Sequence, residues 1–404
     1  MRIPFSPPDI TQDDIDAVAE VMRSGWITTG PKTKEFERRI ALFCGTDRTV
    51  CLGSATAALE LTLRFLGIGQ GDEVVTSAYT YSASASVIAH TGAAVVLADV
   101  DPGSYHISPA RVLDAVTHRT KAVIAVDIAG VPCDYDALYA ALVQKKHLYR
   151  PKTLLQSCFE RPVLIADAAH SLGAAYKNRP VGSIADFTCF SFHAVKNLTT
   201  AEGGAVTWRP VKGIADADVY KNFMLLALHG QDKDALAKQA AENWGYDIRL
   251  LGYKCNMTDM AAALGVSQLS RYPKTLIKRR GLIEEYDRAF CALDIECLRH
   301  FTDEYSSSGH LYPVRLLGRD EAFRDGVIRR MAQRGVATNV HYKPLPMHSA
   351  YQRMGFDIRD FPNAYGMYRN EITLPLYSAM TGDEIGLTIG AFVRELAARS
   401  AACM

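Results

Sequence analysis

Short apolar segments alternate with longer segments of helical periodicity over the first two thirds of the chain. The periodicity predicts helices over residues 13–22, 57–66, 83–90 and 135–143. The apolar runs between and after them predict strands over residues 74–76, 94–98, 122–126, 163–166, 187–191 and 204–208. Short buried strands that alternate with helices are typical of a mostly parallel sheet with helices on both faces, so we expect an α/β fold.

The pattern changes near residue 258. It predicts helices over residues 257–269, 275–293, 321–334 and 383–398, and strands over 311–316 and 336–340. The charged, amphipathic stretch 275–293 is typical of a helix that bridges two domains. We therefore expect a large domain over residues 1–265, with an N-terminal arm, and a smaller C-terminal α+β domain over residues 266–404. The basic, proline-interrupted connection 144–162 is expected to be a surface excursion.

Composition narrows the class of protein. The chain has 404 residues, of which 48% are hydrophobic and 22% charged, as in soluble globular proteins. The formal net charge of +1 gives no bulk attraction to nucleic acid or to an anionic membrane, so we expect neither as a partner. Nine cysteines without a CxxC pair favour reduced thiols. No signal peptide or membrane span is recognisable, so we expect a cytoplasmic location.

Two titratable residues stand where α/β proteins place their chemistry. Asp167 comes at the carboxyl end of a buried strand, the edge at which open parallel sheets bind ligands, although an acid there serves as a helix N-cap about as often. Lys196 follows the strand 187–191 and precedes a Gly-Gly pair. A lysine in a confined site loses its proton more easily and becomes a nucleophile toward carbonyls. An acid to face a pyridine nitrogen and a lysine to form an imine are what pyridoxal 5'-phosphate (PLP) requires.

A phosphate cradle and a stacking surface would complete such a site. The turn Ser54-Ala55-Thr56-Ala57 lies between a strand end near Leu52 and a helix start, where free N–H groups favour an anion, although Ser and Thr are also ordinary N-caps. Ser191 could add a hydroxyl, and Tyr79 or Tyr81 could cover the ring. We expect no metal, because His341 and His348 lack metal-ligand spacing.

With these motifs in order, the chain resembles the DegT/DnrJ/EryC1/StrS aminotransferases, which act on nucleotide-linked keto sugars. The matching motifs extend over nearly the whole chain: Ser54-Ala-Thr-Ala, Asp167-Ala-Ala-His170, Ser191-Phe-His-Ala-Val-Lys196-Asn, Ala201-Glu-Gly-Gly204, Gly252-Tyr-Lys-Cys-Asn256-Met-Thr-Asp259 and Val340-His341-Tyr342. The likeness is strongest to enzymes that aminate C4 of a UDP-linked 4-keto sugar. It implies the type I, aspartate aminotransferase-like fold.

The resemblance also implies roles for individual residues. Lys196 would form the internal aldimine and Asp167 would pair with the pyridine nitrogen. The other cofactor contacts would come from Thr56, Ala57, Tyr81, His170, Ser191 and, from the neighbouring subunit, Asn256; His229, His341 and Tyr342 would border the sugar nucleotide. Tyr81 stands where the arabinose-type enzymes have a tryptophan, which leaves an aromatic face but weakens a direct transfer of substrate.

The implied reaction is a transamination in two halves. L-Glutamate would leave its amino group on the cofactor as pyridoxamine phosphate, and a nucleotide-linked keto sugar would then accept it, in a homodimer with shared active sites. A sugar dehydratase of the same fold is one alternative, although that branch carries a histidine in place of the lysine. A PLP-binding regulatory protein and a purely structural protein are further alternatives. The aminated sugar would belong to polysaccharide or antibiotic-sugar biosynthesis.

Overall fold

A seven-stranded, mostly parallel sheet forms the centre of the computed structural model, which describes residues 2–233 and 245–397. Its strand order is β1-β9-β8-β5-β4-β2-β3, and β9 alone runs antiparallel to its neighbours. The strands are β1 (Thr49–Leu52), β2 (Glu73–Ser77), β3 (Ala94–Ala98), β4 (Thr120–Val126), β5 (Val163–Asp167), β8 (Phe187–Ser191) and β9 (Gly204–Trp208). The predicted α/β class is confirmed, and every strand predicted for the first two thirds of the chain is present.

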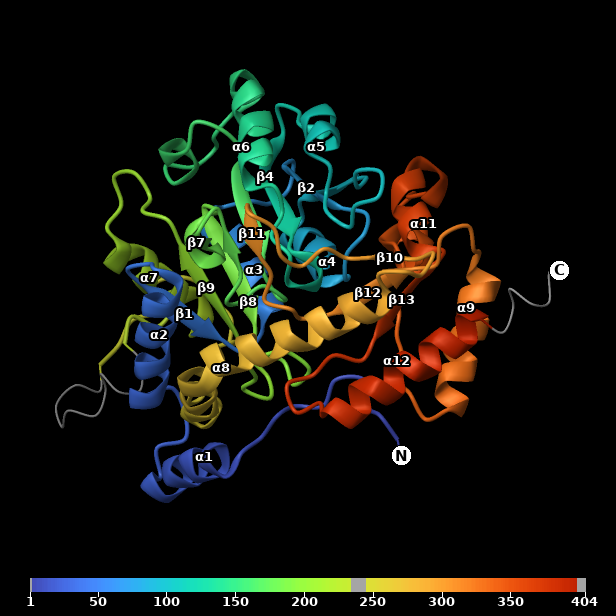
Figure 1. The fold of residues 1–404 in the computed structure, drawn as a ribbon. Helices are drawn as coiled ribbons and strands as arrows, with labels where there is room; N and C mark the ends of the chain where they lie inside the picture. The colour runs from blue at the N-terminus through green and yellow to red at the C-terminus, as the bar shows by residue number, and fades with distance from the viewer. Residues whose placement is uncertain (1, 234–244, 398–404) are drawn as a thin grey trace.

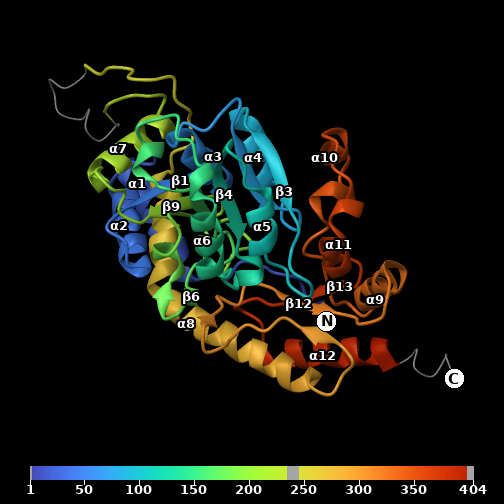
Figure 2. The ribbon, with the colours of Figure 1, turned by 90° about the horizontal axis from the view of Figure 1, so that it is seen from above.

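Helices cover both faces of this sheet, as Figures 1 and 2 show. Alternate residues of β4 enter different cores: Val123 and Ala125 pack on one face, and Ala122 and Ile124 on the other. The first face carries α2 (Pro31–Cys44), α6 (Tyr135–Gln144) and the start of α8 (Asp259–Phe290), and the second carries α3 (Ala55–Phe65), α4 (Ala83–Thr91) and α7 (Asp216–Ala227). The first helix of the chain, α1 (Gln12–Ser24), precedes α2, and α5 (Pro109–Ala115) lies beside α6.

The predicted pair of helices over 257–269 and 275–293 is wrong, because the chain forms one helix, α8, through Pro273. Proline removes one main-chain donor and favours a break, but side chains on each side of it are anchored. Tyr272 Oη donates to the Leu172 carbonyl oxygen at 2.8 Å, and the buried Arg279 guanidinium donates to the carbonyls of Gly309, His310 and Leu376. The expected domain boundary at 265/266 falls inside α8, and the division into two domains stays a prediction.

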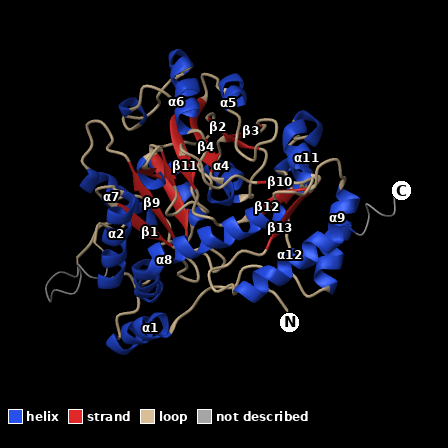
Figure 3. Cartoon of the chain, in the orientation of Figure 1, coloured by secondary structure: helices blue, strands red, loops and turns tan. Residues whose placement is uncertain are grey.

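Beyond α8, helices pack on a three-stranded sheet of order β10-β12-β13 (Figure 3). The elements here are β10 (Glu296–Cys297), β12 (Tyr312–Arg315), α9 (Glu321–Gln333), α10 (Ser349–Arg353), α11 (Pro362–Tyr368), β13 (Glu371–Leu374) and α12 (Gly382–Ala397). A second small sheet joins β6 (Ala175–Tyr176), β7 (Arg179–Pro180) and β11 (Tyr305–Ser306). The last residue of the predicted helix 383–398 lies outside the described residues.

Several local predictions differ from the structure. Residues 336–340 form no strand; only isolated bridges occur, Val336 with Ile3 and Asn339 with Thr373. Ten of the helices and strands named above were not predicted: α2, α5, α7, α10, α11, β6, β7, β10, β11 and β13. For α2 the sequence does carry a start signal, because Pro31 occupies the first helical turn.

The 144–162 connection is anchored at the corner between α3 and β2. The buried Gln156 side chain donates to the Leu66 carbonyl oxygen at 3.0 Å, and Lys152 pairs with Asp72 at 2.6 Å. None of the residues predicted for the site takes part in these contacts. Among the described residues, no helix combines the length and the apolar character needed to cross a membrane.

Candidate active site

Lys196 and Asp167 come from adjacent strands of the central sheet. Asp167 ends β5 and lies beside Cys189 of β8 in the parallel register, and β8 leads into the turn that carries Lys196. In that turn the Lys196 N–H donates to the His193 carbonyl oxygen at 2.9 Å. The two side chains therefore approach each other at the carboxyl edge of the sheet, where their charges influence each other.

The protein environment shifts both ionisation equilibria. Loss of solvation lowers the pKa of the half-buried Lys196 to about 8, against the opposing effect of the Asp167 carboxylate. Burial also raises the pKa of Asp167, while hydrogen bonds from Ser84 and from the Ala169 N–H favour its charged form. Ser84 Oγ in α4 donates to Asp167 Oδ2 at 2.6 Å. The site thus combines a readily deprotonated amine with a positioned acid.

His170 is held as a neutral ring with a defined tautomer. The Ala129 N–H donates to His170 Nδ1 at 3.2 Å, so that nitrogen carries no proton. Burial and the nearby Lys196 charge hold the pKa of His170 well below its usual range. Its proton therefore lies on Nε2, which donates to Tyr342 Oη at 3.1 Å. The Tyr342 hydroxyl proton is then left for an acceptor outside this pair.

Ala129, which supplies that N–H, adopts a left-handed conformation with φ of 59°. Its carbonyl oxygen accepts the His310 N–H at 3.0 Å, and the His310 ring lies 4.4 Å from the His170 ring between centroids. His310 Nδ1 in turn donates to Asn197 Oδ1, next to Lys196. Ser84, Ala129 and His310 were missed by the sequence prediction, since none stands in a recognisable motif, and Asn197 was quoted only as the end of the Lys196 motif, without a role.

The predicted phosphate cradle lies where β1 and β8 end and the antiparallel β9 begins. Leu52 of β1 and Ser191 of β8 are both register partners of Gly204 in β9. A Cβ on Gly204 would lie 2.3 Å from the Ser54 carbonyl carbon, so only glycine lets the turn approach β9. Ser54 Oγ caps α3 by accepting the Ala57 N–H at 3.0 Å. The amides at positions 55 and 56, with the half-buried Thr56 hydroxyl, are thus better placed for an anion than Ala57.

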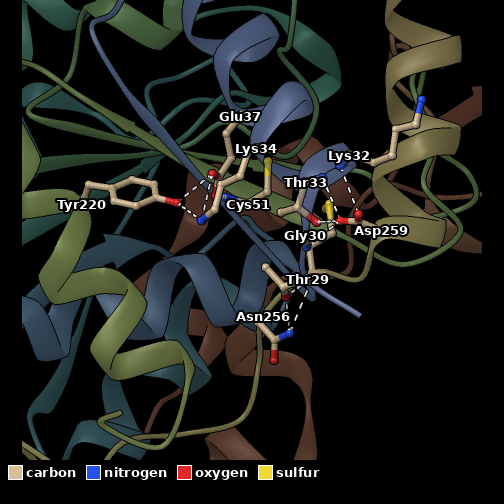
Figure 4. Close-up of polar contacts among 11 residues, drawn as sticks. Thr29, Gly30, Lys32, Thr33, Lys34, Glu37, Cys51, Tyr220, Asn256 and Asp259 are labelled. Carbon is tan, nitrogen blue, oxygen red and sulfur yellow. Dashed lines mark hydrogen bonds and ion pairs between the residues drawn. The ribbon is translucent and has the colours of Figure 1, made fainter. Parts of the chain in front are cut away.

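Asn256 lies beside this cradle in its own chain. It forms a bridge with Leu52, and Cys255 accepts the Gly53 N–H at 2.7 Å. Its side-chain amide donates to Thr29 Oγ1 at 2.5 Å, as Figure 4 shows. Asp259 fastens the same segment to α2 by accepting the Gly30 and Thr33 N–H groups. A contact from Asn256 to the site of a neighbouring subunit stays a prediction.

The remaining predicted residues divide into two groups. His341 and Tyr342 join the Lys196 group, since Lys196 lowers the pKa of His341 and Tyr342 contacts His170. Tyr81 is 64% exposed and lies 6.0 Å from the Tyr342 ring between centroids. His229 lies in the hairpin that leads to Asn256, with φ of 57°, and its N–H donates to the Tyr253 carbonyl oxygen at 2.7 Å. No contact among residues 2–233 and 245–397 joins His229 to Lys196.

A separate cavity of about 500 Å³ lies elsewhere, lined by Tyr105, His106, Tyr176, Arg299 and Arg315 among others. It includes none of the predicted site residues. Within the part of the chain that the structure describes, no cluster of three or more His, Cys, Asp and Glu side chains could hold a metal ion.

Comparison with known proteins agrees with this geometry. The DegT/DnrJ/EryC1/StrS aminotransferase family matches residues 8–392. Spore coat polysaccharide biosynthesis protein SpsC of Bacillus subtilis (strain 168) is 37% identical over 402 residues, covering 98% of this chain and 97% of that protein.

Solved structures show the same likeness. Spr1654 of Streptococcus pneumoniae, assigned as a sugar aminotransferase, is 49% identical in its PMP form, with a TM-score of 0.95 and coverage of 97% of this chain and 98% of that one. Its PLP form gives 47% identity and a TM-score of 0.94 over 98% of each chain. PseC of Helicobacter pylori, an aminotransferase involved in the biosynthesis of pseudoaminic acid, is 26% identical with a TM-score of 0.86, covering 98% of this chain and 100% of that one.

The fold is that of a type I PLP-dependent enzyme. More particularly, the chain belongs to the DegT/DnrJ/EryC1/StrS aminotransferase family, and the resemblance found in the sequence is confirmed.

Proposed function

We propose that this protein transfers the amino group of L-glutamate to C4 of a UDP-linked 4-keto sugar. The observation that carries the proposal is the meeting of a desolvated lysine amine, Lys196, and a buried acid, Asp167, at one sheet edge beside a helix N-terminus. The family supplies the reaction type.

The residues present fit PLP. When bound, PLP supplies an aldehyde that accepts an amino group and a ring that takes up electrons. Asp167 would face the ring nitrogen with a carboxylate that Ser84 and the Ala169 N–H hold in place. The space that a Cβ on Gly204 would fill, beside the start of α3, suits a phosphate group.

In the proposed mechanism Lys196 does the proton work. Its neutral Nζ takes the α-proton of glutamate in the first half of the reaction and returns a proton to the sugar carbon in the second. Asp167 would keep the ring nitrogen protonated by a charge-assisted hydrogen bond, and the amides at positions 55 and 56 with the Thr56 and Ser191 hydroxyls would hold the phosphate, so the reacting atoms would stay within reach of Lys196.

The sugar substrate is supported by the relatives. SpsC is named for polysaccharide biosynthesis, Spr1654 is assigned as a sugar aminotransferase, and PseC acts in the biosynthesis of an amino sugar acid. The UDP carrier, the C4 position and the glutamate donor follow from the motif likeness described above. We also propose a homodimer in which Asn256 reaches the neighbouring phosphate and His229 and His341 border the sugar nucleotide.

The test has two stages. Holoenzyme mixed with L-glutamate should lose the visible absorbance of bound PLP and release 2-oxoglutarate, and Lys196→Ala should do neither. UDP-, dTDP- and GDP-linked keto sugars are then added one at a time, and the UDP-linked 4-keto sugar should restore the absorbance and be aminated. An absorbance band that survives long exposure to glutamate would contradict the proposal and favour a PLP-binding regulatory protein. Loss of water from the sugar without amination would favour the dehydratase.

A further inference from the structure

A buried chain of hydrogen bonds stands behind His341. Glu371 and Thr373 lie two residues apart in β13, so their side chains project from the same face of the strand. The Thr373 hydroxyl contacts Glu371 Oε1, and His341 Nδ1 lies 2.9 Å from Thr373 Oγ1. Glu371 Oε2 also accepts the main-chain N–H of His341 at 2.9 Å. The sequence analysis assigned no role to Glu371 or Thr373.

The direction of donation along these hydrogen bonds is fixed because the Thr373 hydroxyl has only one proton. If Glu371 is ionised, Thr373 donates to it and accepts from His341 Nδ1–H, which leaves His341 Nε2 without a proton. If Glu371 carries a proton, it donates to Thr373, Thr373 donates to Nδ1, and the ring proton lies on Nε2. Passing from the second state to the first releases one proton, which leaves from Nε2.

The His341 ring lies close enough to Lys196 for the lysine charge to act on it. Among residues 2–233 and 245–397, no hydrogen-bond partner contacts Nε2. The Phe5 ring stacks on His341 with 5.4 Å between centroids, and the next residue, Ser6, donates to the carbonyl oxygen of Val195, the neighbour of Lys196. Burial, together with the Lys196 charge, lowers the pKa of His341 to about 3, so the ring itself stays neutral.

We propose that Glu371 and Thr373 are positioning residues that set the hydrogen-bonding role of His341 toward the substrate. His341 Nε2 donates when Glu371 carries a proton and accepts when Glu371 is ionised. The part concerning the sugar rests on the proposed function: the donor form suits a keto or hydroxyl oxygen of the sugar, and the acceptor form suits only a hydroxyl.

The surroundings of Glu371 make both states accessible. Burial raises its pKa to about 8, against the opposing effects of the Thr373 hydroxyl, the His341 N–H and the Arg324 charge. Arg324, in α9, donates to the main-chain carbonyl of Glu371 rather than to its carboxylate. Three tyrosines, Tyr79, Tyr105 and Tyr342, lie close enough to Glu371 for its charge to act on them. Arg315, opposite Glu371 in β12, pairs with Glu296 instead.

The tautomer of His341 is the direct test. The holoenzyme is labelled with ¹⁵N-histidine, and its imidazole nitrogens are observed by NMR without substrate on both sides of pH 8, with His341→Gln to assign the signals. We expect Nε2 to be protonated below this pH and bare above it. Glu371→Gln, whose amide can donate to Thr373 at every pH, should keep Nε2 protonated throughout.

Two variants of Thr373 provide the control. Thr373→Ser keeps the hydroxyl and should preserve the pH-dependent change, whereas Thr373→Val should abolish it. A wild-type ring with one tautomer on both sides of pH 8, or a Glu371→Gln ring that changes like the wild type, would overturn the proposal.

Kinetics give a second measurement that separates this inference from the proposed function. In Glu371→Gln and Thr373→Val, the pH dependence of kcat/KM for the keto sugar should flatten, with a difference of about tenfold from wild type above pH 8. Thr373→Ser should keep the wild-type profile. If the wild-type enzyme fails to react with glutamate, the proposed function is refuted. The NMR measurement needs no substrate, so it tests only the hydrogen-bond chain from Glu371 through Thr373 to His341.

Discussion

The two sides of the active site are built in different ways. On one side, Asp167 ends β5, Lys196 lies in the turn that follows the adjacent strand β8, and both act through charge. On the other, His341 and Tyr342 are neutral groups whose proton positions are set by partners on other segments, Thr373 and His170. The comparison shows that a site can separate the residues that move charge from the residues that fix hydrogen-bond direction.

The difference has an energetic consequence. Removing the partner of a buried charge costs much free energy, because the low-dielectric surroundings do not replace the lost interaction. A neutral hydrogen bond contributes about 1 kcal/mol. Variants of the first side should therefore lose orders of magnitude in rate, and variants of the second side should lose small factors.

Removal of the Lys196 amine should have the largest effect. Lys196→Ala should lower turnover with glutamate and a keto sugar by about 10⁴-fold or more, because it removes the amine proposed to move the substrate proton. The measurement is 2-oxoglutarate formation at steady state. Unchanged circular dichroism and bound, noncovalent PLP would show that the fold is intact. Activity near that of wild type would exclude Lys196 as the proton carrier.

Neutralisation of the acid should be the next largest effect. Asp167→Asn should slow the glutamate half-reaction by about 10²- to 10³-fold, because the ring nitrogen loses its charged partner. The matched control is Ser84→Ala, which removes one hydrogen bond to the same carboxylate and should cost about fivefold. Stopped-flow absorbance measures both rates. If both variants slowed the glutamate half-reaction by the same factor, the charge of Asp167 would not be the cause of its effect on the rate.

The sequence predicted the charged side far better than the neutral side, for a physical reason. Asp167 and Lys196 are placed by local signals, a buried strand that ends in an acid and a strand followed by hydroxyls and glycines. Glu371 and Thr373 act only because β13 brings them to His341, and β13 was not predicted. Which residues β13 approaches depends on its pairing with β12 and on its bridge at Asn339, and these long-range contacts are not encoded in the local sequence of β13.

The same reason explains the details of the cradle and of α8. The turn at Ser54 was visible as a motif, but which N–H groups stay open depends on the Ser54 cap, a choice of side-chain conformation. Pro273 favours a helix break, and hydrogen bonds to Leu172, Gly309 and His310 anchor α8 on both sides of it. Long-range contacts of this kind leave no periodic signal in one sequence.

The pKa of Lys196 predicts how the apoenzyme captures its cofactor. A lysine with a pKa lowered to about 8 is mostly charged below that pH and mostly neutral above it, and only the neutral amine attacks an aldehyde. The rate of covalent PLP capture should therefore rise about tenfold per pH unit below pH 8 and level off above it. With an ordinary lysine, the rate of capture would keep rising up to about pH 10. Absorbance after mixing apoenzyme with PLP measures the rate, with Lys196→Ala as the blank.

Loss of the Tyr342 hydroxyl should have the smallest effect and gives the sharpest test of the contrast. His170 donates to Tyr342 Oη, which leaves one hydroxyl proton for a ligand, so Tyr342→Phe removes a single neutral hydrogen bond. We expect kcat/KM to fall by about five- to tenfold, since a neutral bond contributes about 1 kcal/mol. Both half-reactions should be measured, with the thermal midpoint as a check on the fold. A loss as large as that of Asp167→Asn would mean that Tyr342 takes part in moving charge, and the division between the two sides would fail.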